Sequence, residues 1–301
     1  MEGREEANRE ATGQEVAKTE GNVDDEEDLT SGLSRVSLAE SPTIMTWDTA
    51  DLGILRGIFA DADLIALDLE GVDLGRFGRT SIVQIATVKK CVLLDVLGAD
   101  KGSPLVAWLR EILEDSRVTK IIHDCRMDAD ALLHEFDIRL TGVHDTSCFH
   151  NAITGRVDVN LNDTLTHYRL DKNTNRDGSV YRTNHAFWAT RPMTSKMKAW
   201  ASDDVNSMFQ LHAAQRQRAG TGKSAAEARG AEYLEWADAQ ATTLTVRSPG
   251  SFIGRGGSNL RALQNSTRTI IYGRGPRDKC EFAVYYRDEE GLDRVRRAAR
   301  R

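Results

Sequence analysis

The amino-acid sequence predicts a mixed α/β domain followed by a small α+β domain, and two observations lead to this prediction. Short apolar strand patterns come first along the chain and amphipathic helical patterns follow them, an order typical of a sheet covered by helices. Beyond about residue 240 the chain becomes basic, and strand and helix patterns alternate again. A length of 301 residues is sufficient for two ordinary domains.

The charge is distributed unevenly along the chain. Residues 1–40 carry 12 acidic and 4 basic side chains, whereas residues 241–301 carry 13 basic and 6 acidic ones. Residues 1–40 also contain few large apolar side chains, so burial cannot offset the entropy lost on ordering, and we predict a disordered acidic tail. The acidic run at residues 24–28 is either a solvated stretch or a contact for a basic partner.

The cysteines and the apolar runs indicate the compartment. The four cysteines are scattered without a C-x-x-C pair, which predicts neither a disulfide framework nor structural zinc. The sequence shows no secretory signal, and no apolar run approaches the ~20 residues that a membrane helix needs. We therefore expect an intracellular protein, cytoplasmic or nuclear, with no membrane partner and no small-molecule cofactor.

The first predicted domain spans residues 41–217 and its elements can be placed from periodicity and capping residues. Asp48 is the predicted cap of the first helix, and residues 171–184 are polar and predict a loop. Residues 218–240 are rich in Ala, Gly and charge and predict a linker with a short helical piece around 232–238. The predicted strands are 43–47, 64–70, 80–87, 91–96 and 119–123, and the predicted helices are 48–59, 104–113, 128–136, 146–153, 162–168 and 194–217.

Two acids on one strand are the first candidate site residues. Side chains alternate along a strand, so Asp68 and Glu70 share one face while their leucine neighbours lie on the other. Two adjacent buried carboxylates repel each other unless a cation neutralises them, and Mg²⁺ or Mn²⁺ prefers such oxygen ligands. The alternative is that the strand frays here and both acids meet solvent.

Two further acids come from predicted helices. Asp128 lies in the opening turn of a helix that follows a short strand, with Asp124 and Asp130 as competitors, of which Asp130 is expected on the outer side of the helix. On the long helix, Trp200 and Asp204 share a face with a methionine at four-residue spacing. An Asp on such an apolar face predicts an inward, functional role.

These segments resemble the three motifs of the DEDD superfamily of 3′–5′ exonucleases, in the branch that contains RNase D, the Werner-type exonucleases and Egalitarian. The resemblance covers residues 43–215 and implies a ribonuclease-H-like sheet with helices on both sides. It also implies two divalent ions, Mg²⁺ or Mn²⁺, held by four carboxylates, and release of nucleoside 5′-monophosphates from the 3′ end. The matching residues are Asp68 and Glu70 on the strand, Lys120, His123 and Asp128 in the second motif, and Trp200 to Val205 in the third.

The third motif departs from the branch at Trp200, where a tyrosine normally helps to orient the attacking water. An indole offers an N–H donor and no acceptor, so it cannot hold water in the same way. We include Trp200 among the catalytic residues with Asp68, Glu70, Asp128 and Asp204. Its side chain is predicted either to fill the core in place of tyrosine or to stack on the terminal base.

The basic C-terminal segment, residues 241–301, contains a glycine-rich loop that resembles the KH signature I-G-x-x-G-x-x-I/L. Strand and helix patterns around it predict the order β-α-α-β-β-α of a type I KH domain, although the first helix would be short. An unrelated α+β domain with a Gly-rich turn is the alternative. The predicted nucleic-acid-binding residues are Gly254, Arg255, Gly256, Gly257 and Arg261, together with His123 of the second exonuclease motif.

The combined prediction is a metal-dependent 3′–5′ exonuclease whose KH domain binds single-stranded RNA, or single-stranded DNA. The alternative is a catalytically weak or silent protein that keeps the exonuclease fold for binding RNA or a protein partner. A third possibility is a scaffold among ribonucleoprotein components.

Overall fold

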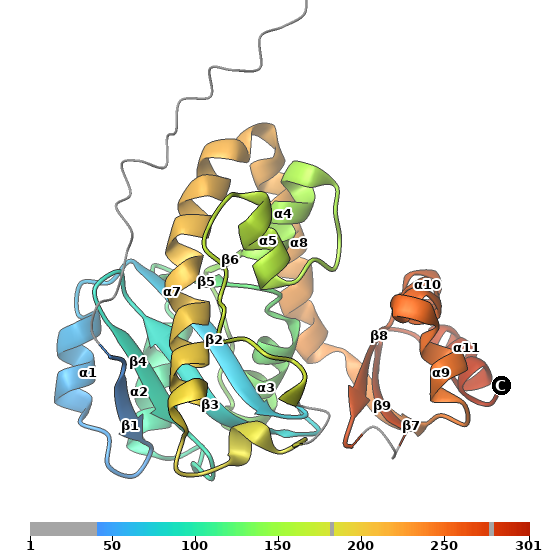
Figure 1. Cartoon of the computed structure of the whole chain (residues 1–301), viewed down its shortest axis with the longest axis horizontal. Helices are drawn as coiled ribbons and strands as arrows, with labels where there is room; N and C mark the ends of the chain where they lie inside the picture. The colour runs from blue at the N-terminus through green and yellow to red at the C-terminus, as the bar shows by residue number, and fades with distance from the viewer. Residues whose placement is uncertain (1–40, 181–183, 277–279) are drawn as a thin grey trace, which may run out of the picture. The chain divides into compact units, whose positions relative to one another are not determined.

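A six-stranded mixed sheet forms the centre of the first domain (Figure 1). Its order is β1-β4-β3-β2-β5-β6, in which β3 runs antiparallel to both of its neighbours and the other neighbouring pairs are parallel. The computed structural model describes residues 41–180, 184–276 and 280–301, so the predicted acidic tail lies outside the described residues. The strands are β1 (Thr43–Thr46), β2 (Leu64–Val72), β3 (Arg79–Ala86), β4 (Cys91–Asp95), β5 (Thr119–Ile122) and β6 (Val143–Asp145).

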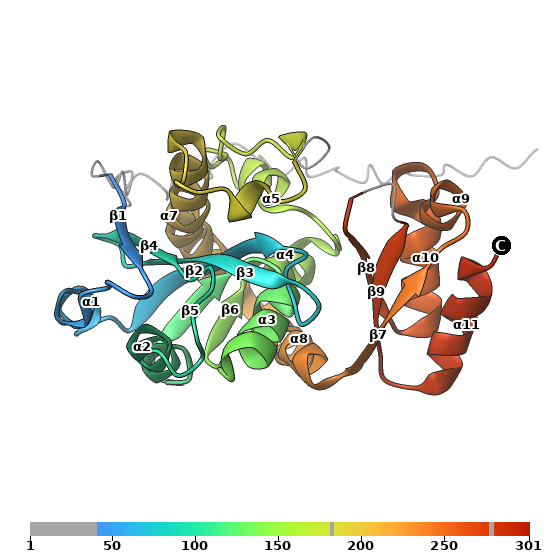
Figure 2. The same cartoon turned by 90° about the horizontal axis from the view of Figure 1, so that it is seen from below.

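Helices cover both faces of this sheet, as Figure 2 shows. One core packs α1, α2 and α3 against the leucine-bearing face of β2, and a second core packs α5 and α7 against the opposite face. This arrangement confirms the predicted mixed α/β class. The helices are α1 (Leu52–Phe59), α2 (Pro104–Leu113), α3 (Arg126–Phe136), α4 (Thr146–Thr154), α5 (Leu161–His167) and α7 (Ser195–Arg218), with the 3-10 turn η1 (Phe187–Ala189).

One predicted helix start is wrong. Helix α1 is capped by Asp51, whose carboxylate accepts hydrogen bonds from the backbone N–H groups of Gly53 and Ile54 at 2.9 and 3.1 Å. The predicted cap, Asp48, lies three residues earlier in a turn. An Asp at either position can cap a helix, and only the backbone conformation decides which one does.

The segment predicted as a linker contains a well-packed helix. The turn η2 (Gly220–Gly222) leads into α8 (Lys223–Leu234), which contacts α4 and β6 of the first domain. Its small side chains allow this close approach, since Ala226 is buried and a Cβ at Gly230 would lie 3.9 Å from the Asp145 Cβ. The same Ala and Gly content suggested a linker because composition alone does not show what a helix face contacts. The predicted helical piece near 232–238 is confirmed in part, as η3 (Glu235–Asp238).

The C-terminal segment folds around a three-stranded antiparallel sheet of order β7-β9-β8. One face of this sheet packs on its helices through residues that include Phe282 and Val284, and the other face carries Ala283 and Tyr285. The element order agrees with the predicted β-α-α-β-β-α order, and α9 is short, as expected. The elements are β7 (Gln240–Thr245), α9 (Pro249–Ile253), η4 (Arg255–Gly257), α10 (Ser258–Thr267), β8 (Ile270–Arg274), β9 (Glu281–Tyr286) and α11 (Glu289–Ala299).

By their contacts, all the described residues belong to one compact unit. Side chains from the second face of the small sheet meet η3 and residues Phe77 and Met127 of the first domain. None of the described helices is both long enough and apolar enough to cross a membrane.

Candidate metal centre

Strand β2 places two carboxylates on one face of the sheet. It lies between β3 and β5, and the register pairs Asp68 with Gln84 and Glu70 with Ile82. The leucine at position 67 and the one at position 69 point into the opposite core, as the alternation of a strand requires. A register irregularity follows directly between Glu70 and Gly71. Such irregularities bend a strand and often occur beside functional sites.

Helix α7 brings a third carboxylate to the same face. It packs across β2, β3 and β4, and Asp204 on its inner side is completely buried. One oxygen from each of Asp68, Glu70 and Asp204 lies within 4.8 Å of the others. We call these three residues the carboxylate cluster.

The fourth predicted acid, Asp128, lies beside the cluster. It is 5% exposed in the first turn of α3, and its Oδ1 accepts a hydrogen bond from the Leu69 N–H at 3.0 Å. That bond ties the helix to the strand residue between the two β2 acids. Asp128 is therefore adjacent to the cluster, although the set within 4.8 Å contains only the other three acids.

Burial and mutual repulsion raise the pKa values of these acids. Loss of solvent and then the charge of Asp204 raise the pKa of Asp68 from 3.8 to about 7. Loss of solvent also raises the pKa values of Glu70 and Asp128 well above their ordinary range, with the charge of Asp68 as the second cause in both. The raised pKa values mean that the ionised carboxylates are unfavourable in the protein without metal, and a divalent cation would stabilise them. Since all donors are carboxylate oxygens, the residues fit Mg²⁺ or Mn²⁺.

Residues 49–217 match the family model described as 3′–5′ exonuclease. The chain belongs to the 3′–5′ exonuclease family. The motif acids of the preceding paragraphs all fall within the matched residues. The resemblance inferred from the motifs is thereby confirmed for the exonuclease domain.

Individual relatives agree with this assignment. The chain is 36% identical over 85 residues to the piRNA biogenesis protein EXD1 of Mus musculus, a match that covers 28% of this chain and 14% of EXD1. Trypanosoma brucei RNase D in complex with RNA U12 superposes with a TM-score of 0.55 at 23% identity, covering 67% of this chain and 72% of that one. Brucella melitensis NrnC with bound Mg²⁺ gives a TM-score of 0.55 at 20% identity, covering 66% and 92%. These structures confirm the ribonuclease-H-like exonuclease fold.

Trp200 lies in the core of the exonuclease domain. Its ring is 1% exposed and packs edge-on against Trp188, with ring centroids 5.3 Å apart. No appreciable part of the ring is open to a base, so the structure favours core filling over base stacking. Burial raises the pKa of Asp204, and the nearby Arg176 charge and hydrogen bonds from Asn173 and Trp200 offset part of that rise.

The loop at residues 171–180 supplies two site residues that the sequence did not predict. Asn173 is 4% exposed, and its Nδ2 donates to the Trp200 carbonyl and to Asp204 Oδ1, both at 2.9 Å. The guanidinium of Arg176 lies near the same acid, with 3.6 Å between Nη2 and Oδ2. Both residues come from a polar stretch without periodicity, which offers no signal in the sequence for such a role.

The side chain of His123 is held by protein groups. Its Nδ1 lies 2.8 Å from Thr146 Oγ1 and its Nε2 lies 2.9 Å from the Val159 carbonyl oxygen. Burial lowers the pKa of His123. In this arrangement the ring fastens β5 to the following segments, and the predicted role in nucleic-acid binding stays a prediction.

The two competitors of Asp128 have different surroundings. Asp124 adopts a left-handed backbone conformation, with φ of 62°, and forms a bidentate ion pair with Arg126 at 2.5 and 2.7 Å. Asp130 was expected on the outer side of α3, and this expectation is wrong because it is fully buried. The helix periodicity did place it away from Asp128, but that side of the helix is covered by η3 and by β9.

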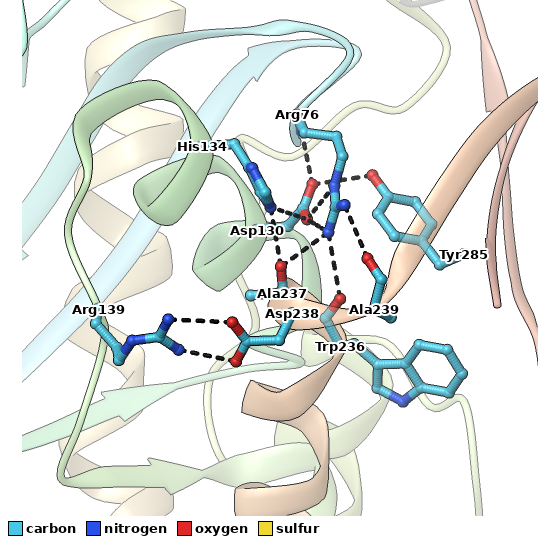
Figure 3. Close-up of polar contacts among 9 residues, drawn as sticks. All are labelled: Arg76, Asp130, His134, Arg139, Trp236, Ala237, Asp238, Ala239 and Tyr285. Atoms are coloured by element: carbon cyan, nitrogen blue, oxygen red, sulfur yellow. Dashed lines mark hydrogen bonds and ion pairs between the residues drawn. The ribbon is translucent and has the colours of Figure 1, made fainter. Parts of the chain in front are cut away.

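Asp130 is the centre of a hydrogen-bond network shown in Figure 3. Its Oδ2 accepts hydrogen bonds from the backbone N–H of Arg76 at 2.6 Å and from the Tyr285 hydroxyl at 3.0 Å. Its Oδ1 accepts a hydrogen bond from Nε of the Arg76 guanidinium at 2.8 Å. The same guanidinium donates to the carbonyl groups of Ala237 and Ala239, each at 2.8 Å. We call Arg76, Asp130, Tyr285 and these carbonyl groups the Asp130 network. It joins α3, the β2–β3 turn, η3 and β9.

The glycine-rich loop of the C-terminal segment has the backbone that only glycine adopts easily. Gly254, Gly256 and Gly257 have φ of 74°, 58° and 78°. A Cβ at Gly254 would approach the Asn259 side chain to 2.6 Å, so the loop turns tightly onto α10. Arg255 and Arg261 are both exposed beside these glycines. The geometry brings the predicted phosphate-binding residues together, and their role remains a prediction.

Proposed function

We propose that the protein is a two-metal 3′–5′ exonuclease that shortens single-stranded nucleic acid, RNA above all, and releases nucleoside 5′-monophosphates. The observation that carries this proposal is the convergence of Asp68, Glu70 and Asp204 within 4.8 Å. Asp128 beside them completes the donor set. Two divalent ions held by these four acids would activate a water and stabilise the leaving 3′ oxygen.

The chain's own residues orient this set. Asn173 fixes one oxygen of Asp204, and the backbone of Leu69 fixes one oxygen of Asp128. Asp128 and Asp204 are buried while Asp68 and Glu70 are half-buried, so solvent screens the charges of the site only in part and electrostatic interactions there are strengthened. Trp200 cannot act as the acceptor that a tyrosine provides, so we expect slower turnover than in a site with tyrosine.

RNA is the preferred substrate because of the relatives and the C-terminal segment. The RNase D of T. brucei has been solved with RNA U12. We propose that the C-terminal segment is a KH domain that holds the single strand through its glycine-rich loop and Arg255. The chain spans only 14% of the length of EXD1, so nothing about the biology of that protein is transferred.

The second candidate function is an exonuclease fold without turnover that binds RNA or assembles with ribonucleoprotein components. The observation that favours it is Trp200, which occupies the position of the water-orienting tyrosine and is buried. The four acids would then hold metal for structure alone.

Incubation of 5′-labelled single-stranded RNA and DNA with Mg²⁺ or Mn²⁺ separates the two candidates. We expect a ladder of shortened RNA that disappears with Asp68→Ala and persists with Asp61→Ala, an exposed acid of the same domain. Intact RNA with tight, salt-dependent binding would support the silent candidate. A gain of turnover in Trp200→Tyr would show that this position limits the chemistry.

The KH proposal has its own test. Arg255→Glu should weaken RNA binding and leave metal binding unchanged, since the loop lies in the other domain. Arg297→Glu makes the same charge change on exposed α11 and serves as the control. Equal weakening by both variants would indicate attraction by overall charge alone, without a specific loop.

A further inference from the structure

We propose that Arg176 is the phosphate-binding residue of the exonuclease site, where it holds the phosphate of the 3′-terminal nucleotide. The inference rests on the proposed function, because it names the group that contacts the substrate at that same site. It is carried by three observations: the position of the guanidinium at the carboxylate cluster, the cavity it lines, and the contacts that hold its loop.

The guanidinium balances the charge of the cluster. While burial is the main cause that raises the pKa values of Asp68, Glu70 and Asp204, the charge of Arg176 lowers all three. Its Nη2 lies 3.6 Å from Asp204 Oδ2, which is ion-pair contact at a distance longer than a hydrogen bond. Arg176 therefore stands at the edge of the cluster as one positive charge among several negative ones.

The same side chain faces a cavity of about 500 Å³. The Arg176 side chain is 32% exposed and lines this cavity together with His123 and Asn160. Arg261 and Gln264 of the C-terminal segment also line it. None of the four acids is among the described residues that line the cavity, so Arg176 lies between the cluster and a space whose volume can admit a nucleotide. A guanidinium has five N–H donors in a planar fork, so it can contact a carboxylate and a phosphate oxygen together.

The loop that carries Arg176 is fastened on both sides to α7. Asn173 donates to the Trp200 carbonyl and to Asp204, and Asn175 donates to Asp203 Oδ2 at 2.7 Å. After Arg176, the carboxylate of Asp177 accepts from Lys196 Nζ at 2.8 Å. These contacts set the position of the guanidinium relative to Asp204 before any ligand arrives.

This position predicts opposite effects on two ligands. A divalent cation is repelled by the guanidinium, so removing Arg176 should strengthen metal binding. A phosphate is attracted by it, so the same change should weaken nucleotide binding. A residue that only supports the loop would not change the two affinities in opposite directions.

The test measures Mn²⁺ and a nucleoside 5′-monophosphate separately by calorimetry on the full chain, without turnover. For Arg176→Ala we expect Mn²⁺ to bind at least about tenfold more tightly, from the loss of one nearby positive charge. Uridine 5′-monophosphate should bind roughly 10- to 100-fold more weakly, as for the loss of a charged hydrogen bond. Arg176→Lys should recover part of the nucleotide affinity, and Lys172→Ala, an exposed cation of the same loop, should change neither affinity.

The proposal is overturned if nucleotide affinity in Arg176→Ala stays within about twofold of the parent chain, or if both affinities fall together. Should Arg176→Ala fail to fold, Arg176→Gln, which retains hydrogen-bond donors without charge, takes its place with the same expected signs. The binding assay also separates this inference from the proposed function. A chain without nuclease activity can still lose nucleotide affinity, and an active chain can keep it.

Discussion

Two buried acidic regions lie on opposite sides of the start of helix α3, and their surroundings differ. Asp128 faces the carboxylate cluster, where burial and repulsion raise pKa values. Asp130, two residues later, is fully buried with Arg76 and Tyr285 as hydrogen-bond donors. In the Asp130 network, Arg76 supplies one positive charge for one carboxylate. In the cluster, the single nearby charge of Arg176 faces several carboxylates. The carboxylate of Asp130 is compensated inside the protein, whereas the raised pKa values of the cluster are typical of a site that binds a ligand.

The largest expected effect comes from removing one charge of the cluster. Asp204→Asn should reduce exonuclease activity by at least about a thousandfold, because metal charge supplies several kcal/mol of transition-state stabilisation. Gel assays of labelled RNA measure this change, with calorimetry of Mn²⁺ binding alongside. Retained activity, or a loss of similar size in Asp61→Asn, would contradict the assignment.

The Asp130 network should show its effect in stability. Asp130→Ala leaves the Arg76 guanidinium, whose side chain is 15% exposed, without its fully buried carboxylate, so we expect a cost near the lower end of the about 3–5 kcal/mol typical of buried pairs. Urea unfolding of the metal-free chain measures this change. The free energy of unfolding of Asp130→Asn should lie between those of Asp130→Ala and the parent chain. A loss below about 1 kcal/mol would show that the network contributes little, as exposed pairs do.

The dependence of stability on pH distinguishes the two regions further. Because the folded pKa of Asp68, about 7, exceeds its ordinary value of 3.8, the folded chain binds the extra proton between these values. This residue therefore makes the free energy of unfolding fall as pH rises from about 4 to about 7. Without metal, Asp68→Asn should gain stability over the parent across this window, by up to about 1.4 kcal/mol per pH unit.

The comparison with Asp68→Asn removes the contribution of buried histidines, which titrate in both chains. Chemical unfolding at several pH values in a chelator measures the difference. Added Mn²⁺ should stabilise the parent chain more than the variant, and more at pH 8 than at pH 5, values about one unit above and two below that pKa. Because the charge of Asp68 also raises the pKa values of Glu70 and Asp128, a stability difference that stays constant with pH would mean that these coupled acids do not titrate in this range.

The smallest expected effect concerns the hydroxyl that joins the C-terminal sheet to Asp130. Tyr285→Phe removes one hydrogen bond to the carboxylate but leaves Arg76 in place, so the expected cost is about 1–2 kcal/mol. Thermal unfolding detects a change of this size. The same substitution at Tyr286, at the end of β9, is the matched control and should have less effect.

Local sequence patterns were sufficient for much of the fold and for the acids of the site. Strand periodicity placed Asp68 and Glu70 on one face of β2, and helical spacing placed Trp200 and Asp204 on one face of α7. Both inferences need only the order of neighbouring residues. The C-terminal order of strands and helices followed from the same local reasoning. The motif spacing then identified the family, which residues 49–217 confirm.

Other features depended on contacts between segments far apart in the chain. The loop residues Asn173 and Arg176 reach Asp204 only through the fold, and no periodicity marks them. The composition of helix α8 resembled that of a linker, because its small residues show their packing role only through their contacts with α4 and β6. Local periodicity predicts which side chains share a face of an element, but it does not predict which other segment contacts that face.

The sequence by itself therefore determined the class of the fold and its family, and it predicted the four acids of the candidate metal centre. The tertiary structure decided which acids have a positive charge and hydrogen-bond donors beside them within the protein. Asp130 was expected at the surface and is buried by η3 and β9, while Trp200 proved to be core rather than an open stacking surface. The physical reason is that burial and charge pairing are properties of the assembled chain, since the partners of Asp130 come from residues 76 and 285.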